Sequence, residues 1–169
     1  VAEEIRNPER FVPRALALIP QPQRPLVTHQ AGEKHFAALQ RAYAEAGVDA
    51  ECVPFIDEMG RRYAEADLVI ARSGATTVAE LCAVGIASVL VPYPHAADDH
   101  QYDNAQQLVT RDAAVLVLQR DLDPGSLAAW LREVDRPRLL AMARAARALR
   151  KADSVDRVAQ VCIDLGTRR

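Results

Sequence analysis

From Pro25 onward, short β-branched runs alternate with longer segments of helical pattern. This alternation is typical of βαβ units, in which crossover helices join parallel strands. We expect strands at Leu26–His29, Ala50–Val53, Leu68–Ala71, Ser88–Val91 and Val115–Leu118. We expect the helices between them at Glu33–Ala46, Asp57–Ala66, Thr77–Val84 and Gln101–Thr110. Because the connections are short, right-handed crossovers place these helices on both faces of a doubly wound parallel sheet, a Rossmann-like α/β fold.

After Leu118 the pattern changes to helices only. Asp123-Pro124, Arg136-Pro137 and Asp153-Ser154 each have the composition of a helix start, so we expect a helical C-terminal tail. The basic residues of this tail fit a solvated helix face better than a membrane-surface patch.

The first twenty residues do not fit the alternation. A sheet of this kind normally opens with an apolar strand and a glycine turn, but Val1–Phe11 is charged and Val12–Ile19 already has helical character. We therefore expect that a strand and its glycine loop are missing between Phe11 and Val12. On this interpretation residues 1–11 are a linker remnant and residues 12–169 form the domain.

Charge and cysteine content exclude several classes of protein. The 169 residues include 21 Lys and Arg against 23 Asp and Glu, so no basic excess favours a nucleic-acid partner. Cys52, Cys82 and Cys162 lack the spacing of a zinc site or a disulfide framework, which indicates reduced thiols. The longest apolar stretch, from Leu81 to Tyr93, is too short to span a membrane, and the acidic start does not predict a signal peptide.

The segment from Ala66 to Glu80 carries the first chemical signal. An apolar strand runs into a turn of small residues from Ser73 to Thr77, and a helix begins at once. Backbone N–H groups without intrahelical partners then point out of the carboxyl end of the strand, which is a geometry that binds phosphate. The alternative is that Ser73 or Thr76 only caps the helix.

Glu80 follows Thr77 by three residues, so both lie on one face of that helix. A carboxylate close to a bound phosphate is explained if it accepts hydrogen bonds from ribose hydroxyls. The alternative is a capping box with Thr77, or a favourable interaction with the helix dipole.

A second polar segment follows the strand that ends at Val91. Its position predicts that it lies at the same carboxyl edge, where open α/β sheets bind ligands. Two prolines stiffen it, and its polar side chains are His95, Asp98, Asp99, His100 and Gln101. This density suits a sugar better than a metal ion, since no further pair of metal ligands has suitable spacing. A serine hydrolase is disfavoured because the chain has no G-x-S-x-G motif.

Five segments together carry a resemblance to a known family. They are His29–Gly32, Pro54–Met59, Ala66–Val69, Arg72–Glu80 and Val91–Gln101, in this order. They resemble the C-terminal, donor-binding half of the MurG family, the UDP-N-acetylglucosamine transferases of bacterial peptidoglycan synthesis. The resemblance runs from about Val12 to the end of the chain.

The resemblance implies one half of a GT-B fold and an inverting, metal-independent transfer that uses no cofactor. N-acetylglucosamine would move from UDP-N-acetylglucosamine to lipid I, giving lipid II at the cytoplasmic face of the bacterial inner membrane. The acceptor contacts, the general base and most of the peripheral membrane contact would belong to an N-terminal domain outside this soluble one, so no catalytic residue is expected here. The alternatives are a separate donor-binding subunit of a two-chain transferase and a UDP-sugar binding module without catalysis.

The resemblance also implies roles for particular residues. Ile56 and Met59 would contact the uracil, with the backbone at Ile56 reading its edge, and Glu80 would bind the ribose. Gln101, with His100, would bind the transferred sugar. The diphosphate would lie against Ser73, Gly74, Ala75, Thr76 and Thr77, with Arg72 nearby.

Overall fold

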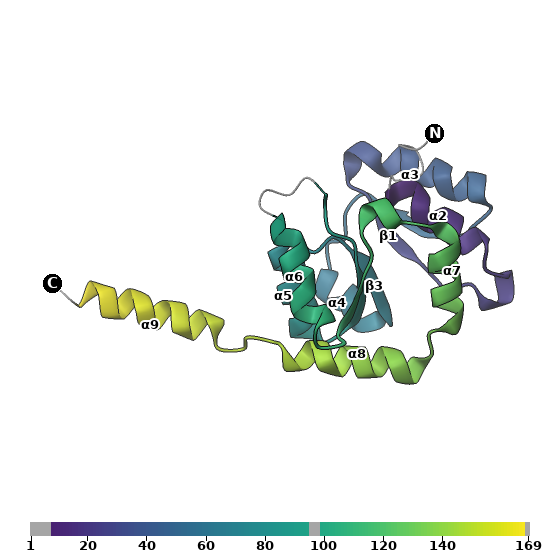
Figure 1. Cartoon of the computed structure of the whole chain (residues 1–169). Helices are drawn as coiled ribbons and strands as arrows, with labels where there is room; N and C mark the ends of the chain where they lie inside the picture. Colours follow the sequence, from purple (N-terminus) through teal and green to yellow (C-terminus); the bar gives the residue numbers. More distant parts are fainter. Residues whose placement is uncertain (1–7, 95–98, 168–169) are drawn as a thin grey trace.

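The computed structural model describes residues 8–94 and 99–167 (Figure 1). The first part contains α2 (Pro8–Ala17), η1 (Gln21–Gln23), β1 (Thr28–Gln30), α3 (Glu33–Ala46), β2 (Glu51–Val53), α4 (Met59–Glu65), β3 (Leu68–Ala71), α5 (Ala75–Val84) and β4 (Ala87–Leu90). The second contains α6 (His100–Val109), β5 (Ala114–Leu116), η3 (Gln119–Asp121), α7 (Pro124–Glu133), α8 (Arg136–Ala148) and α9 (Ser154–Gly166).

The strands are all parallel, as the alternation predicted, but they form two groups. β1 pairs with β2, and β3, β4 and β5 form a second sheet in that order. Parallel strands joined by helices confirm the doubly wound α/β fold. The single continuous sheet that we expected is replaced, within the described residues, by a two-stranded and a three-stranded sheet.

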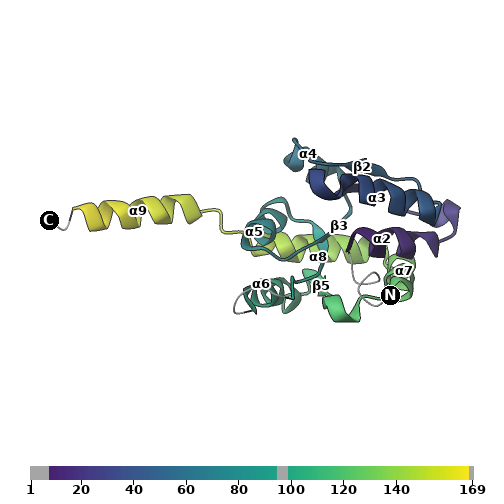
Figure 2. The same cartoon turned by 90° about the horizontal axis from the view of Figure 1, so that it is seen from above.

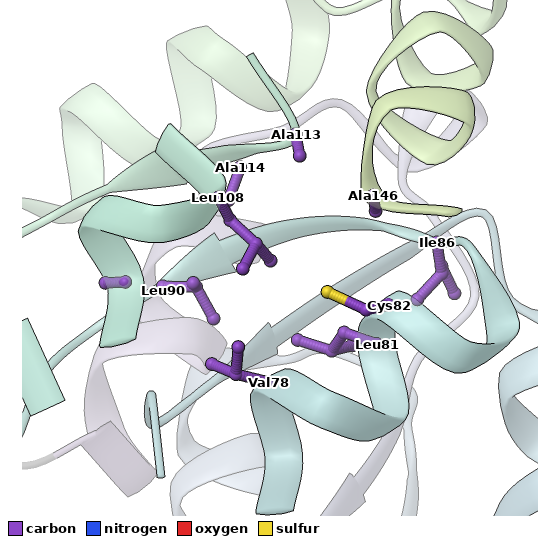
Figure 3. Packing of buried hydrophobic residues seen from close by; sticks show 10 residues of the cluster. Val78, Leu81, Cys82, Ile86, Leu90, Leu108, Ala113, Ala114 and Ala146 are labelled. Carbon is purple, nitrogen blue, oxygen red and sulfur yellow. The ribbon is translucent and has the colours of Figure 1, made fainter. Parts of the chain in front are cut away.

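Helices cover both faces of the three-stranded sheet. Val69 of β3 and Leu90 of β4 pack in a cluster with residues of α5, α6 and α8. Figure 3 shows this cluster, in which Leu90 lies between Val78 of α5 and Leu108 of α6. The neighbouring Ile70 packs in a different cluster, with residues of α2 and α7. Successive strand residues point to opposite faces, so this division places α2 and α7 on the face opposite α5, α6 and α8.

The two-stranded sheet shares its helices with the three-stranded one. Leu16 of α2, Leu39 of α3 and Ala128 of α7 form the core cluster that packs beside Cys52 of β2. Val12 of α2 contacts both this cluster and the one that contains Ile70. Helix α2 therefore holds the two sheets together on one face.

Helix α2 begins at Pro8 and runs without a break across Phe11 and Val12, so it starts four residues before the expected Val12. Phe11 is only 4% exposed and packs against Val91 and Leu122. The packed core thus includes a residue that we assigned to a linker. That a strand and a glycine loop are missing at this junction stays a prediction.

Helix starts after Leu118 are confirmed at all three expected places. Asp123 caps α7 by accepting a hydrogen bond from the Ser126 N–H, and Asp135 caps α8 in the same way from Arg138. Strand β3 has the expected bounds, and the ends of the other strands differ from expectation by at most two residues. Leu26 is fully exposed, so the first strand begins at Thr28 instead.

Helix α9 extends away from the rest of the molecule in both views (Figures 1 and 2). None of the helices in the described part of the chain is both long enough and apolar enough to cross a membrane.

Candidate functional site

The residues that the sequence assigned to a site lie in the loops after β2, β3 and β4 and in the helices α4, α5 and α6 that follow these loops. The turn after β3, residues 72–74, is the shortest of these connections. Gly74 is the N-cap of α5 with φ −61° and ψ 150°, and no side chain caps this end of the helix. The first intrahelical bond runs from the Val78 N–H to the Gly74 carbonyl. The N–H groups of Ala75, Thr76 and Thr77 therefore have no intrahelical acceptor.

This geometry excludes one of the two interpretations of the turn. Neither Ser73 nor Thr76 caps α5, so the capping alternative is wrong. A helix of ten residues with three N–H donors at its start presents a positive end to an anion. The exposed Ala75 and Thr76 leave this end open to solvent.

Ser73 has a structural partner. Its side chain is 0% exposed, and its Oγ donates a 2.7 Å hydrogen bond to the carbonyl of Gln101 at the start of α6. Asn104 Nδ2 donates in turn to the Ser73 carbonyl at 3.1 Å. The Ser73 hydroxyl thus fixes α6 against the β3–α5 turn. The Asn104 contact could not be predicted from the sequence, because Ser73 and Asn104 are far apart along the chain.

Arg72 binds the protein's own main chain. Its Nη1 donates to the carbonyls of Val91 and Pro92 at 3.2 and 3.0 Å, and its Nη2 donates to Gln119 Oε1 at 2.8 Å. The guanidinium carbon also lies 5.4 Å from the centre of the Tyr93 ring. Burial lowers the pKa of Arg72 from its ordinary value. Arg72 therefore holds the loop after β4 in place, whereas the resemblance implied only that it lies near the diphosphate.

Glu80 is exposed on α5, where Tyr63 donates a 3.2 Å hydrogen bond to its Oε2. Burial, with the Glu80 charge beside it, raises the pKa of Tyr63. Because Gly74 is the N-cap, Thr77 and Glu80 are the third and sixth residues of the helix, and they cannot form a capping box. The carboxylate keeps lone pairs that can accept further hydrogen bonds.

The loop after β2 presents an apolar surface and one occupied backbone donor. Phe55 is 65% exposed, so it is not a core residue, and Ile56 and Met59 are half-buried. The Ile56 N–H, expected to read a base edge, donates to Gln30 Oε1 at 2.9 Å. A base would have to displace that side-chain amide. Gln30, to which the sequence assigned no role of its own, is thus part of this region.

The loop after β4 is tied to α6 through Gln101. Gln101 Oε1 accepts a 2.9 Å hydrogen bond from the Tyr93 N–H, while His100 is exposed beside it at the helix start. Asp99, the N-cap of α6, has the left-handed φ of 50°. His95 and Asp98 lie outside the described residues. Within the described ranges, no three His, Cys, Asp or Glu side chains are grouped so that they could hold a metal ion.

Most of the chain, including these loops and helix starts, matches a known protein family. The family described as the glycosyltransferase family 28 C-terminal domain matches residues 8–158. The chain belongs to this family. The matched range includes every site residue discussed above and both sheets of the family 28 domain.

Curated relatives are longer than this family 28 domain. This chain is similar to a protein of Aromatoleum aromaticum named UDP-N-acetylglucosamine–N-acetylmuramyl-(pentapeptide) pyrophosphoryl-undecaprenol N-acetylglucosamine transferase. The two are 58% identical over 158 residues, which cover 94% of this chain and 44% of the relative. The transferase of the same name from Burkholderia thailandensis is 56% identical over 155 residues, covering 89% and 42%. The chain therefore spans less than half the length of these relatives.

Solved structures agree with the fold. The crystal structure of Acinetobacter baumannii MurG matches with a TM-score of 0.82 and 34% identity, over 95% of this chain and 48% of that one. The glycosyltransferase VinC in complex with DTDP matches with a TM-score of 0.62 and 20% identity over 95% of this chain and 39% of that chain, which supports the fold alone. The predicted membership in one half of a GT-B fold is thus confirmed.

Proposed function

We propose that this chain is the donor-binding half of a transferase that moves N-acetylglucosamine from UDP-N-acetylglucosamine to lipid I, forming lipid II in peptidoglycan synthesis. The observation that carries the proposal is the uncapped start of α5 at the carboxyl edge of the sheet, within a family 28 domain. The name shared by the relatives supplies the donor and the acceptor class.

The diphosphate of the donor would bind at the start of α5. Its oxygens would accept hydrogen bonds from the backbone N–H groups of Ala75, Thr76 and Thr77, and the Thr76 hydroxyl could add another. A helix terminus acting on a solvated anion contributes about 0.3–1 kcal/mol. One well-placed donor at charge that develops during reaction contributes about 2.7–4 kcal/mol. Closure of a second domain over this site would therefore matter more than the helix dipole alone.

The rest of the donor would lie on either side of that diphosphate. Glu80 would accept hydrogen bonds from the ribose, and Ile56 and Met59 would pack on the uracil beside the exposed Phe55. Gln101 and His100, at the start of α6, would bind the transferred sugar. Arg72 would act through the loop that it holds, since its donors already bind main-chain carbonyls and Gln119.

The reaction we propose is an inverting one in which an acceptor hydroxyl attacks the anomeric carbon and UDP leaves. The domain would stabilise the departing diphosphate with backbone donors and would need no cofactor or metal ion. The general base and the acceptor site would come from an N-terminal half, which would also provide most of the peripheral contact with the cytoplasmic membrane face. On this proposal the chain binds donor but does not turn over alone.

Titration calorimetry of the full chain with UDP, UDP-N-acetylglucosamine and uridine, all with a chelator present, tests the proposal. We expect both nucleotides to bind and uridine, which lacks phosphate, to bind more weakly. Equal affinity for UDP and uridine would mean that the start of α5 does not hold the diphosphate. Binding only after Mg²⁺ is added would overturn the metal-free account.

A further inference from the structure

Helices α5 and α6 start beyond the carboxyl ends of two paired strands, β3 and β4. The start of α5 carries backbone donors without an intrahelical acceptor, and Gln101 is the second residue of α6. A ligand that reaches from one helix start to the other needs both starts at a fixed separation and angle. The contacts that fix this relation therefore bear on what the site can bind.

The start of α6 is not held by a side-chain cap of its own. Its N-cap residue, Asp99, makes no side-chain hydrogen bond to the first turn. Asp99 also has a left-handed φ of 50°, which a residue other than glycine keeps only where the surrounding structure holds it. The first turn of α6 is therefore placed by contacts with other parts of the fold.

Two hydrogen bonds to one residue of the β3–α5 turn supply such contacts. Ser73 Oγ donates to the Gln101 carbonyl at 2.7 Å, and Asn104 Nδ2 donates to the Ser73 carbonyl at 3.1 Å. Residues 101 and 104 are three apart, so they lie on one face of α6, about one turn from each other. One bond alone would leave a pivot, whereas two bonds one turn apart also fix the rotation of the helix.

Burial makes this pair of bonds hard to replace with water. The Ser73 side chain is fully buried, and Asn104 is half-buried. A shielded polar group that loses its partner is less favourable than one that can turn to solvent. An apolar side chain at position 104 would leave the Ser73 carbonyl without this donor and would loosen the second point of attachment.

The attachment does not use the Gln101 side chain. Ser73 bonds to the main chain of residue 101, while Gln101 Oε1 accepts from the Tyr93 N–H at 2.9 Å. The Gln101 Nε2 group carries two further donors. Because Ser73 directly precedes Gly74, the N-cap of α5, the residue that holds α6 also lies at the start of α5.

We propose that Asn104 is a positioning residue for sugar selection. Through Ser73 it fixes the start of α6, where Gln101 would bind the transferred sugar, relative to the start of α5, where the diphosphate would bind. This inference rests on the proposed donor-binding function. UDP does not reach the start of α6, so its affinity depends little on Asn104. UDP-N-acetylglucosamine spans both helix starts, so a small displacement of α6 takes its hydroxyls out of reach of Gln101.

Titration calorimetry of the full chain with UDP and with UDP-N-acetylglucosamine tests this role in Asn104→Leu, which keeps a similar volume but loses the amide donor. We expect UDP affinity to stay within about twofold of the unmodified chain. The preference for UDP-N-acetylglucosamine over UDP should fall about three- to tenfold, as for one lost hydrogen bond. Gln107→Leu makes the same chemical change at an exposed position of α6 and should leave both affinities unchanged. If Asn104→Leu fails to fold, Asn104→Ala takes its place, since alanine favours helices.

A double variant shows whether Asn104 acts through Gln101. Once Gln101→Ala has removed the sugar contact, adding Asn104→Leu should lower the preference by less than a further twofold. An unchanged preference in Asn104→Leu, an equal loss of affinity for both nucleotides, or a full further fall in the double variant would overturn the positioning role. If the unmodified chain binds neither nucleotide, or binds both equally, the proposed donor site is itself wrong, and this inference with it.

Discussion

Polar side chains at the carboxyl edge of the sheet differ in what they already bind. Ser73, Arg72 and Gln101 are bonded to main-chain groups of neighbouring loops, so they hold the shape of the site. Thr76 and Glu80 lie exposed on α5. Sequence position indicated that all of these residues share one edge, because strand ends meet there. It could not indicate which of them face a ligand, since the bonding partners come from elements far apart in the chain.

Glu80→Ala should weaken UDP binding by about 1–3 kcal/mol, the range for losing a hydrogen bond to a charged group. The fold should survive, because Glu80 is exposed and its one described partner is the Tyr63 hydroxyl. Titration calorimetry gives the affinity and thermal melting gives the stability.

Tyr63→Phe is the matched control, since it removes only the hydroxyl that donates to Glu80. It should leave UDP affinity within about twofold of the unmodified chain. A sharp fall in melting temperature for Glu80→Ala, with unchanged affinity per folded molecule, would mean that Glu80 supports the fold and does not bind ribose.

His29 makes stability depend on pH. Burial lowers the pKa of His29 from 6.5 to about 4, and its ring lies edge-on to Tyr43 with Nδ1 3.1 Å from the hydroxyl. Between these two values the unfolded chain binds a proton that the folded chain does not. Protonation of His29 in the unfolded chain favours unfolding, so the free energy of unfolding falls as the pH falls from about 6.5 towards 4. Above about pH 6.5 His29 is neutral in both states, and its contribution no longer changes with pH. We expect a loss of about 2–3 kcal/mol over this range.

Urea unfolding at pH 7, 5.5 and 4.5 measures this loss, with His29→Phe as the control. Phenylalanine keeps a ring against Tyr43 but does not titrate. Below about pH 6.5 the unmodified chain should lose unfolding free energy relative to His29→Phe as the pH falls. Above that pH the difference between the two proteins should stay constant. A parallel pH dependence in both proteins would assign the effect to other groups.

At the scale of elements, local patterns predicted the helices well and the strand ends less well. Helix starts at Asp123 and Asp135 follow from capping, which is a local interaction within three residues. The first strand was placed two residues early because Leu26 is apolar, although it is fully exposed. Arg72 illustrates what could not be predicted, since its partner Gln119 is 47 residues away along the chain.

Arg72→Met should destabilise the domain by about 1.5–3 kcal/mol, because it removes three charge-assisted hydrogen bonds that join β3 to the loop after β4 and to η3. Urea unfolding measures the change. Gln119→Ala, which removes one of the three acceptors, should cost less. If Arg72→Met instead weakened UDP binding without changing the unfolding free energy, Arg72 would be a phosphate contact and not a positioning residue.

At the scale of the whole molecule, two sheets are held together by α2 and α7 rather than by a continuous ladder. Phe11 of α2 contributes to that packing from a position at which the sequence suggested a linker. Spacing along the chain predicted that a strand was missing, because the expected opening of the fold was absent. It could not predict that α2 and α7 would each contact the cores of two separate sheets, because that packing joins residues far apart in the chain.

Helix α9 contributes little to the stability of the rest. It extends away from the domain in both views, and its side chains at Val158, Val161, Ile163 and Leu165 are 56–65% exposed (Figures 1 and 2). Apolar surface that stays in water provides no burial energy. Deleting residues 154–169 should therefore leave the unfolding free energy unchanged within about 0.5 kcal/mol.

Leu81→Ala gives the scale for this measurement. Leu81 is fully buried in the cluster between α5, α6 and α8, so its truncation should cost about 2–5 kcal/mol. Urea unfolding of both variants at one pH compares them directly. Because an exposed apolar face promotes self-association, the deletion should also raise solubility. A loss of more than about 1 kcal/mol on deletion would mean that α9 packs on the domain in solution.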